Sequence, residues 1–199
     1  GLAGDALTTG VTNIAIGYDA LGTEDTGAGS VAIGAFSLKL QNYNGNAYNV
    51  AIGHDTAKSV TTGIENTIIG ALAGDALTTG SYNVALGKGA LSTEDVGSRC
   101  IAIGYAALSV QNVDGDVYNT AVGYAAGGTV TTGAYNTLIG GLAGDALTAG
   151  GENVAIGYGA LSGEDGHGKN VAIGYHSLVA QNAGVDAYNT AVGYKSGEG

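Results

Sequence analysis

The sequence predicts an all-β fold, a parallel β-solenoid of the β-roll type, and two observations carry this prediction. A four-residue core resembling VAIG, TAVG or TIIG recurs eleven times along the 199 residues. The spacing from one core to the next runs 17, 19, 17 and 17 residues and then repeats. Such regular self-similarity is typical of chains that wind into stacked coils, in which each coil contacts only its neighbours. The glycines that close the cores are Gly17, Gly34, Gly53, Gly70, Gly87, Gly104, Gly123, Gly140, Gly157, Gly174 and Gly193.

The four spacings add up to a longer unit of 70 residues, which a second motif repeats. GLAGDALT occurs at Gly1 and Gly141, and ALAGDALT lies between them at Ala71. Without a linker, we expect one domain of about 11 to 12 coils, on the order of 50 to 60 Å long. This domain spans 1–199, with blocks of approximately 1–70, 71–140 and 141–199. Because the chain stops in mid-block at GYKSGEG, we expect a fragment of a longer repeat protein.

Composition and charge exclude several other classes. The chain has 38 Gly, no Pro, Met or Trp, and 45% hydrophobic residues, so it has enough apolar surface to fold rather than stay disordered. Six Lys and Arg against seventeen Asp and Glu give a net charge of -11. This charge repels phosphate backbones, so we expect no nucleic-acid partner. The sequence has no run of 18 apolar residues, so we also expect no direct membrane insertion.

Each core is typical of a short strand with two apolar faces. The residue before the core glycine is Ile, Val or Leu in all eleven copies, and the residue three before it is Val, Ile or Thr. Ala stands two before the glycine in nine copies, with Ile68 and Leu138 in the other two. Since one face fills the inside of the coil, we expect the small Ala and Gly face to pack against another chain, in a homo-oligomer or filament.

Asparagine stands four before the core glycine in nine copies, and Ser30 and Cys100 take the other two places. We expect these side chains to form a structural ladder, donating to the coil on one side and accepting from the coil on the other. The ladder residues are Asn13, Asn49, Asn66, Asn83, Asn119, Asn136, Asn153, Asn170 and Asn189.

The segments NVAIGYGAL, NTAVGYAAG and NVAIGYHSL resemble the N-x-x-A-I-G-x-x-S/A repeats in the head domains of trimeric autotransporter adhesins. They are also similar to TAIGYxAL repeats of bacteriophage tail-fibre-like proteins, and the resemblance covers essentially the whole chain. It implies a left-handed β-roll, three chains side by side, and attachment to surfaces by an extracellular, cell-surface or virion protein. That adhesin family runs coils of about fourteen residues, so the longer spacings here predict longer outer turns and extra short strands.

One loop is a weak candidate for calcium. In NVDGDVYN, Asn112, Asp114 and Asp116 surround a glycine, and hard oxygen ligands in a turn suit Ca²⁺. The equivalent loops NYNGNAYN and NAGVDAYN do not keep the charge. A solvated turn is therefore the favoured interpretation, and we expect no metal and no cofactor.

Other reactive groups are interpreted as structural. The Glu-Asp pairs that begin at Glu24, Glu94 and Glu164 lie in exposed Gly-rich loops, so we expect solubilising charges rather than general acids and bases. The three histidines fall at unrelated positions of the repeat, which predicts no metal cluster. Cys100 shares its column with Asn and Ser, so we expect a buried small residue rather than a nucleophile. We assign no catalytic residue and expect no enzyme.

Tyrosine follows the core glycine in six copies of the repeat. A flat ring with a polar tip at this place is a possible contact for a host-surface protein or a glycan, although a packing column between coils explains it as well. The six residues are Tyr18, Tyr105, Tyr124, Tyr158, Tyr175 and Tyr194.

The repeats favour a structural or adhesive segment of an extracellular or virion fibre, which provides a rigid rod and an attachment surface. An ice-binding solenoid is the first alternative, and a self-assembling filament subunit is the second. The ice-binding alternative rests on Thr pairs that are missing from alternate stretches of two coils. These pairs begin at Thr8, Thr61, Thr78 and Thr131.

Overall fold

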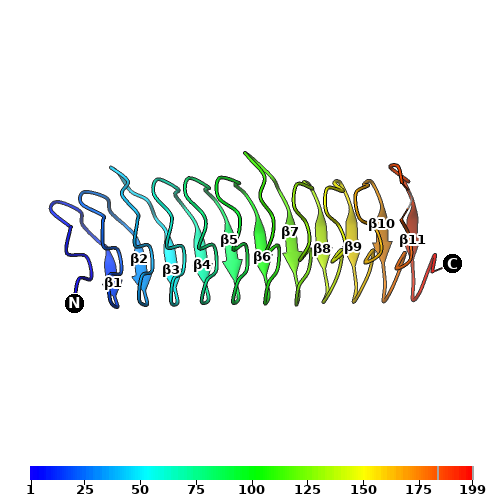
Figure 1. Cartoon of the computed structure of the whole chain (residues 1–199), viewed down its shortest axis with the longest axis horizontal. Helices are drawn as coiled ribbons and strands as arrows, with labels where there is room; N and C mark the ends of the chain where they lie inside the picture. The colour runs from blue at the N-terminus through cyan, green and yellow to red at the C-terminus, as the bar shows by residue number, and fades with distance from the viewer. Residues whose placement is uncertain (183, 199) are drawn as a thin grey trace.

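The computed structural model describes residues 1–182 and 184–198 and confirms an all-β parallel solenoid (Figure 1). Eleven strands form one parallel sheet, in which the spatial order follows the chain. The coils stack along one axis, with the two termini at opposite ends. The strands are β1 (Ile14–Ile16), β2 (Val31–Ile33), β3 (Val50–Ile52), β4 (Thr67–Ile69), β5 (Val84–Leu86), β6 (Ile101–Ile103), β7 (Thr120–Val122), β8 (Thr137–Ile139), β9 (Val154–Ile156), β10 (Val171–Ile173) and β11 (Thr190–Val192).

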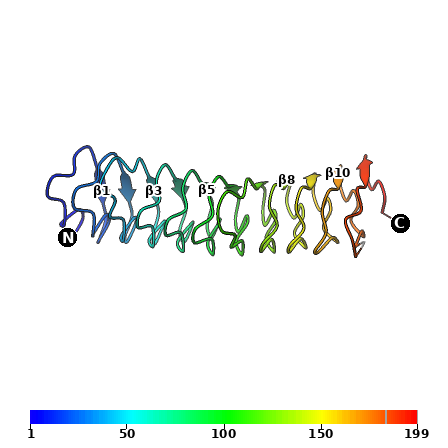
Figure 2. The ribbon, with the colours of Figure 1, turned by 90° about the horizontal axis from the view of Figure 1, so that it is seen from above.

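Seen from above, the strands lie along one side of the rod and the turns lie on the other (Figure 2). Every strand pairs in register with the next, so that Ala85 of β5 faces Ala102 of β6. The 19-residue spacings keep this register because their extra residues lie in longer turns, whose tips project beyond the others in Figure 1. Isolated bridges join Asn46 and Asp116, in the first two of these turns, to Ala28 and Ser98 of the preceding coils. The extra strands expected from the coil length are thus single bridges.

The prediction that the Ala face points outward is wrong. The middle residue of each strand points into the coil, and Ala51, Ala85 and Ala121 are fully buried. The first and third residues point outward and stay partly exposed, as in β3 and β5. The alternation of the strand was correctly inferred, but its two apolar faces were assigned to the wrong sides.

The narrow interior explains why Ala points inward. Most turns opposite the strand carry a buried Leu, such as Leu91. Where the middle strand residue is large, the turn carries glycine instead. A Cβ on Gly74 would lie 2.9 Å from Ile68 Cδ1, and a Cβ on Gly144 would lie 2.8 Å from Leu138 Cδ2. A larger side chain on the strand is therefore matched by a smaller residue in the turn, which keeps the interior closely packed.

The core glycine is required where successive coils touch through their backbones. Gly87 has a φ of 127°, which favours glycine, and a Cβ there would lie 2.4 Å from the carbonyl oxygen of Gly104 in the next coil. A side chain at this position would push two coils apart. The repeat therefore closes each core with glycine.

Candidate interaction surface and side-chain clusters

The first and third residues of β1–β11 form a continuous outer sheet face along the whole rod. Every one of these positions holds Val, Ile, Leu or Thr, and none is charged. The side chains are only partly buried, and Ile101 and Ile103 are exposed. A long sheet face that is apolar and uncharged is unusual on a chain with a net charge of -11.

The six predicted contact tyrosines form a first tyrosine column at one side of this face, two residues after each strand end, and all six are exposed. Their rings stack wherever consecutive coils both carry one. The ring centroids of Tyr105 and Tyr124 are 5.4 Å apart at an interplanar angle of 8°. Tyr175 stacks on Tyr158 at 5.7 Å and on Tyr194 at 5.4 Å. Tyr18 instead meets a phenylalanine edge-on. The column thus packs between coils and still presents ring edges and hydroxyls to solvent.

A second tyrosine column, which the sequence interpretation missed, lies at the other side of the face, two residues before each strand. Its rings are also exposed. Tyr118 stacks on Tyr135 at 5.8 Å, and the Arg99 guanidinium lies 4.8 Å from the Tyr82 ring and 5.8 Å from the Tyr118 ring. The recurring Tyr-Asn dipeptide was the available signal. The column comprises Tyr48, Tyr82, Tyr118, Tyr135 and Tyr188.

The side chains of the Asn column bond mainly to the following coil, and Asn66 and Asn153 also donate to the preceding one. Asn83 Oδ1 accepts a hydrogen bond from Cys100 N at 2.9 Å, and its Nδ2 donates to Gly97 O at 2.9 Å. Both partners lie in the following coil, whereas we expected one bond on each side. The preceding coil is reached through the backbone, because Asn83 N donates to Asn66 Oδ1. The same pair of side-chain bonds is made by Asn13, Asn49, Asn66, Asn119, Asn136 and Asn153.

The last two ladder residues depart from this pattern. Asn170 Oδ1 still accepts from the following coil, at Asn189 N, but its Nδ2 donates to Gly168 O within its own turn. Asn189 Nδ2 donates to Gln181 Oε1 at 2.8 Å. The column therefore combines inter-coil bonds with local bonds to the turns.

The first residue of each Glu-Asp pair is buried, which contradicts its interpretation as a solubilising charge. Glu24 is fully buried and accepts hydrogen bonds from Gly27 N at 2.7 Å and Gln41 Nε2 at 2.9 Å. Gln41 Oε1 in turn accepts from Asn49 Nδ2 at 2.8 Å. These donors compensate the cost of burying a carboxylate. Equivalent networks are Glu94, Gln111 and Asn119, and Glu164, Gln181 and Asn189.

The three calcium candidates, Asn112, Asp114 and Asp116, are all exposed at the tip of a long turn. Asp116 is engaged elsewhere, because its Oδ1 pairs with Arg99 Nε at 2.9 Å and its Oδ2 accepts from Tyr118 at 3.3 Å. The structure therefore places Asp116 in an ion pair with its neighbouring coil.

Cys100 is fully buried. Burial raises the pKa of its thiol to about 11, although Gln111 Nε2 donates to the sulfur at 3.1 Å and opposes that rise. At neutral pH the group is a thiol rather than a nucleophilic thiolate.

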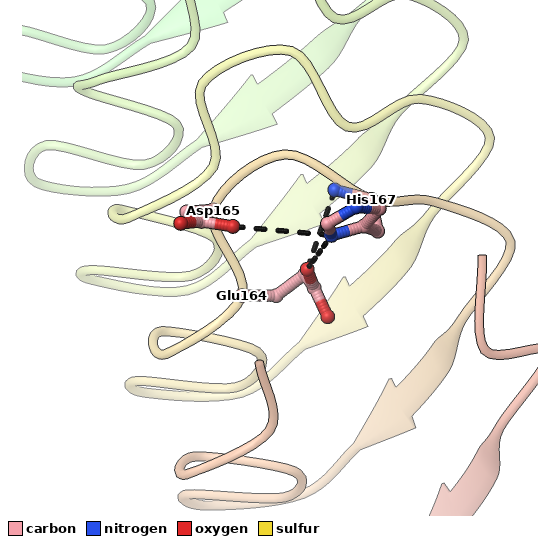
Figure 3. A group of neighbouring side chains, drawn as sticks. All are labelled: Glu164, Asp165 and His167. Carbon is pink, nitrogen blue, oxygen red and sulfur yellow. Dashed lines mark hydrogen bonds and ion pairs between the residues drawn. The ribbon is translucent and has the colours of Figure 1, made fainter. Parts of the chain in front are cut away.

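One loop gathers three potential metal ligands, which the positions of the histidines in the repeat did not predict. Glu164, Asp165 and His167 each present a ligand atom within 4.8 Å of the others (Figure 3). His167 Nδ1 lies 3.2 Å from Glu164 Oε1 and 3.9 Å from Asp165 Oδ1. Glu164 is buried, whereas Asp165 is exposed and His167 is half-buried. The other two histidines lie apart, with His54 Nδ1 paired to Asp55 at 2.8 Å and His176 stacked on Tyr175 at 4.2 Å.

The surface of residues 1–182 and 184–198 has no pocket. Over the same part of the chain, no helix has the length and apolar character needed to cross a membrane. In comparisons with known proteins, no family model, no curated protein and no solved structure matches this chain.

Proposed function

We propose that the chain is a non-catalytic, rigid segment of a fibre exposed outside the cell, on a cell surface or on a virion, and that copies assemble side by side through the outer sheet face. The observation that carries this proposal is the exclusion of charge from that face over all eleven strands of a chain with a net charge of -11. A surface that repels itself elsewhere is thereby left free to associate along one side.

The connections between coils support a rigid rod. Each coil bonds to the next through the sheet, through the Asn column and, at every fourth coil, through a Glu, Gln and Asn network whose carboxylate is buried. Because each connection involves only neighbours, the length of the rod follows the number of repeats. Such a segment sets the distance between a surface and whatever the fibre carries.

The size of the outer face supports self-association. Eleven strands at about 4.8 Å span roughly 50 Å, and the six-residue width between the two tyrosine columns is about 20 Å. The product, roughly 1,000 Å² per chain in total, is of the same order as the ~800 Å² that each partner buries in a typical stable interface. A homo-oligomer, and a trimer in particular from the resemblance to the adhesin repeats, is the proposed assembly.

The mass and shape of the chain in solution test this proposal. We expect light scattering and small-angle X-ray scattering to show a trimeric rod whose mass stays constant over a range of concentrations. Lysine at Ile52 and Ile103 of the outer sheet face should release monomers with unchanged circular dichroism. Thr79→Lys, at an exposed turn, is the control and should leave the mass unchanged. A monomeric parent chain would contradict the assembly.

The tyrosine columns are the proposed contacts for a host-surface protein or a glycan, because tyrosine offers a large apolar surface with a polar tip. Replacing Tyr105 and Tyr124 with Ser should reduce retention of the rod on a receptor-bearing surface without changing its mass. Retention equal to that of the parent chain would show that the contact does not lie in this column.

The hydroxyl bonds made by the first Thr of each pair do not favour the ice-binding alternative. The hydroxyls of Thr8, Thr61 and Thr78 donate to backbone oxygens of the following coil, at 3.0, 3.1 and 3.0 Å. These donors are already used within the rod. The filament alternative has its own signature in the same scattering experiment, since mass would then grow with concentration.

A further inference from the structure

We propose that Glu164, Asp165 and His167 bind a divalent transition metal of the Zn²⁺ class. The inference starts from a departure from the repeat. The equivalent loops read TEDTG at 23–27 and TEDVG at 93–97, whereas this loop reads GEDGH at 163–167. Three of the five residues differ. In the first two blocks the fifth residue is a glycine whose backbone N donates to the buried glutamate, whereas in the third block it is a histidine, which adds an imidazole beside that glutamate.

The contacts of the buried glutamate change in this loop. In the second block, a Cβ on Gly97 would lie 2.5 Å from the carboxyl carbon of Glu94. Gly97 N instead donates to Glu94 Oε1 at 2.8 Å. In the third block the loop has shifted, so that His167 N lies 3.3 Å from Glu164 Oε1 and the ring nitrogen lies 3.2 Å away.

The aspartate changes its environment in the same way. Asp95 Oδ1 is buried without a hydrogen-bond partner. The equivalent Asp165 side chain is 56% exposed and lies 3.9 Å from His167 Nδ1. The ring and the second carboxylate therefore lie together beside Glu164, as Figure 3 shows.

The spacing fits a small dication. Zinc binds carboxylate oxygen and imidazole nitrogen at about 2.0 to 2.2 Å, which places neighbouring ligand atoms about 3 to 4 Å apart. The measured separations of 3.2 and 3.9 Å lie in that range. Three protein ligands at the surface leave further coordination positions for water. An imidazole ligand selects Zn²⁺, Co²⁺ or Ni²⁺ over Ca²⁺ and Mg²⁺, which prefer oxygen alone.

The surroundings orient the ligands and supply charge. Gln181 Nε2 donates to Glu164 Oε2 at 3.0 Å, which directs the other oxygen toward His167. Lys169, the nearest lysine in the chain, is neutralised by Asp186 at 2.7 Å. The two carboxylates of the cluster are therefore available to the dication.

Calorimetric titration of the whole chain with ZnCl₂ tests the site. We expect one Zn²⁺ per chain and no comparable heat with CaCl₂ or MgCl₂. His167→Gly restores the residue found at Gly27 and Gly97, so it should keep the circular dichroism of the parent and weaken Zn²⁺ binding at least tenfold. Asp165→Asn should weaken binding with the fold intact. Zinc affinity that is absent in the parent, or unchanged in His167→Gly, would overturn the proposal.

The repeat also permits a gain-of-site experiment. Grafting GEDGH onto 93–97, as Thr93→Gly, Val96→Gly and Gly97→His, should raise the stoichiometry from one to two Zn²⁺ per chain. A folded graft that still binds one Zn²⁺ would show that this loop sequence does not make the site. Neither outcome affects the proposed rod, whose test is mass and shape without metal.

Discussion

The inner and outer residues of the same three-residue strand have opposite roles, although both are apolar. The inner column is mostly Ala and is completely enclosed by turns, as at Ala85, while the outer column is larger, at Val84 and Leu86, and only partly buried. In an ordinary half-buried strand the larger side chains point inward. In this narrow coil the smaller side chains point inward and the larger ones point outward. The size of a side chain therefore indicates how much space its position has, and does not indicate whether the position is buried.

The largest expected effect comes from enlarging an inner residue. Ala85→Leu should lower the free energy of unfolding by about 3 kcal/mol, because the interior beside Ile68 and Ala102 has no room for three more carbons. Chemical denaturation measures the effect. Leu86→Ala, one residue along and facing outward, is the matched control and should cost far less in the monomer. If the Ala85→Leu chain kept its stability but lost its assembly, the Ala side chains would have to point outward, toward a partner chain.

A slightly smaller loss of stability should follow from removing one member of the Asn column. Asn83→Ala removes the partners of Cys100 N and Gly97 O, and we expect a loss of about 2 kcal/mol because both groups stay buried. Tyr82→Ala, at the exposed neighbouring position, is the control. Equal losses for the two variants would mean that the Asn bonds contribute no more than surface packing does.

The buried Cys100 provides a pH-dependent test of the Asn column, in which it takes one place. The folded pKa of about 11 lies above the usual value near 8.5, so the unfolded chain loses its proton first as pH rises. Stability from this group is present below pH 8 and should fall by about 1 to 2 kcal/mol between pH 8 and pH 10. Cys100→Ser, which installs the residue found at Ser30, should lack this component. Parallel pH profiles for both chains would place the thiol in contact with water.

The smallest effect is expected on the outer face. Val84→Thr places a hydroxyl beside Thr67, its partner in the neighbouring strand, and should change the stability of the monomer by less than about 0.5 kcal/mol. At concentrations where chains associate, the same change should cost more if the outer face is covered. Denaturation at low and high protein concentration separates the two states.

Most of the fold could be predicted from the sequence because the core repeat fixes strand position and register together. The faces could not, since Ala and Ile are both apolar and periodicity alone does not say which side is enclosed. Glu24 was misinterpreted because Glu-Asp in a Gly-rich loop suggests solvent, yet Gln41 recurs at a constant distance from it in every block. His167 was dismissed for lacking equivalents, although the proposed site depends on that same irregularity.

The asparagine bonds give the rod a direction. Asn83 bonds the following coil through both its side-chain oxygen and its side-chain nitrogen, and it bonds the preceding coil through its backbone N. Asn66 and Asn153 also donate back to the side-chain oxygens of Asn49 and Asn136, so the forward side of a coil makes more of the side-chain bonds than the backward side. The two ends of any such stack therefore differ chemically. A segment that caps one end cannot cap the other, and a pulling force meets a different first contact depending on the end at which it is applied.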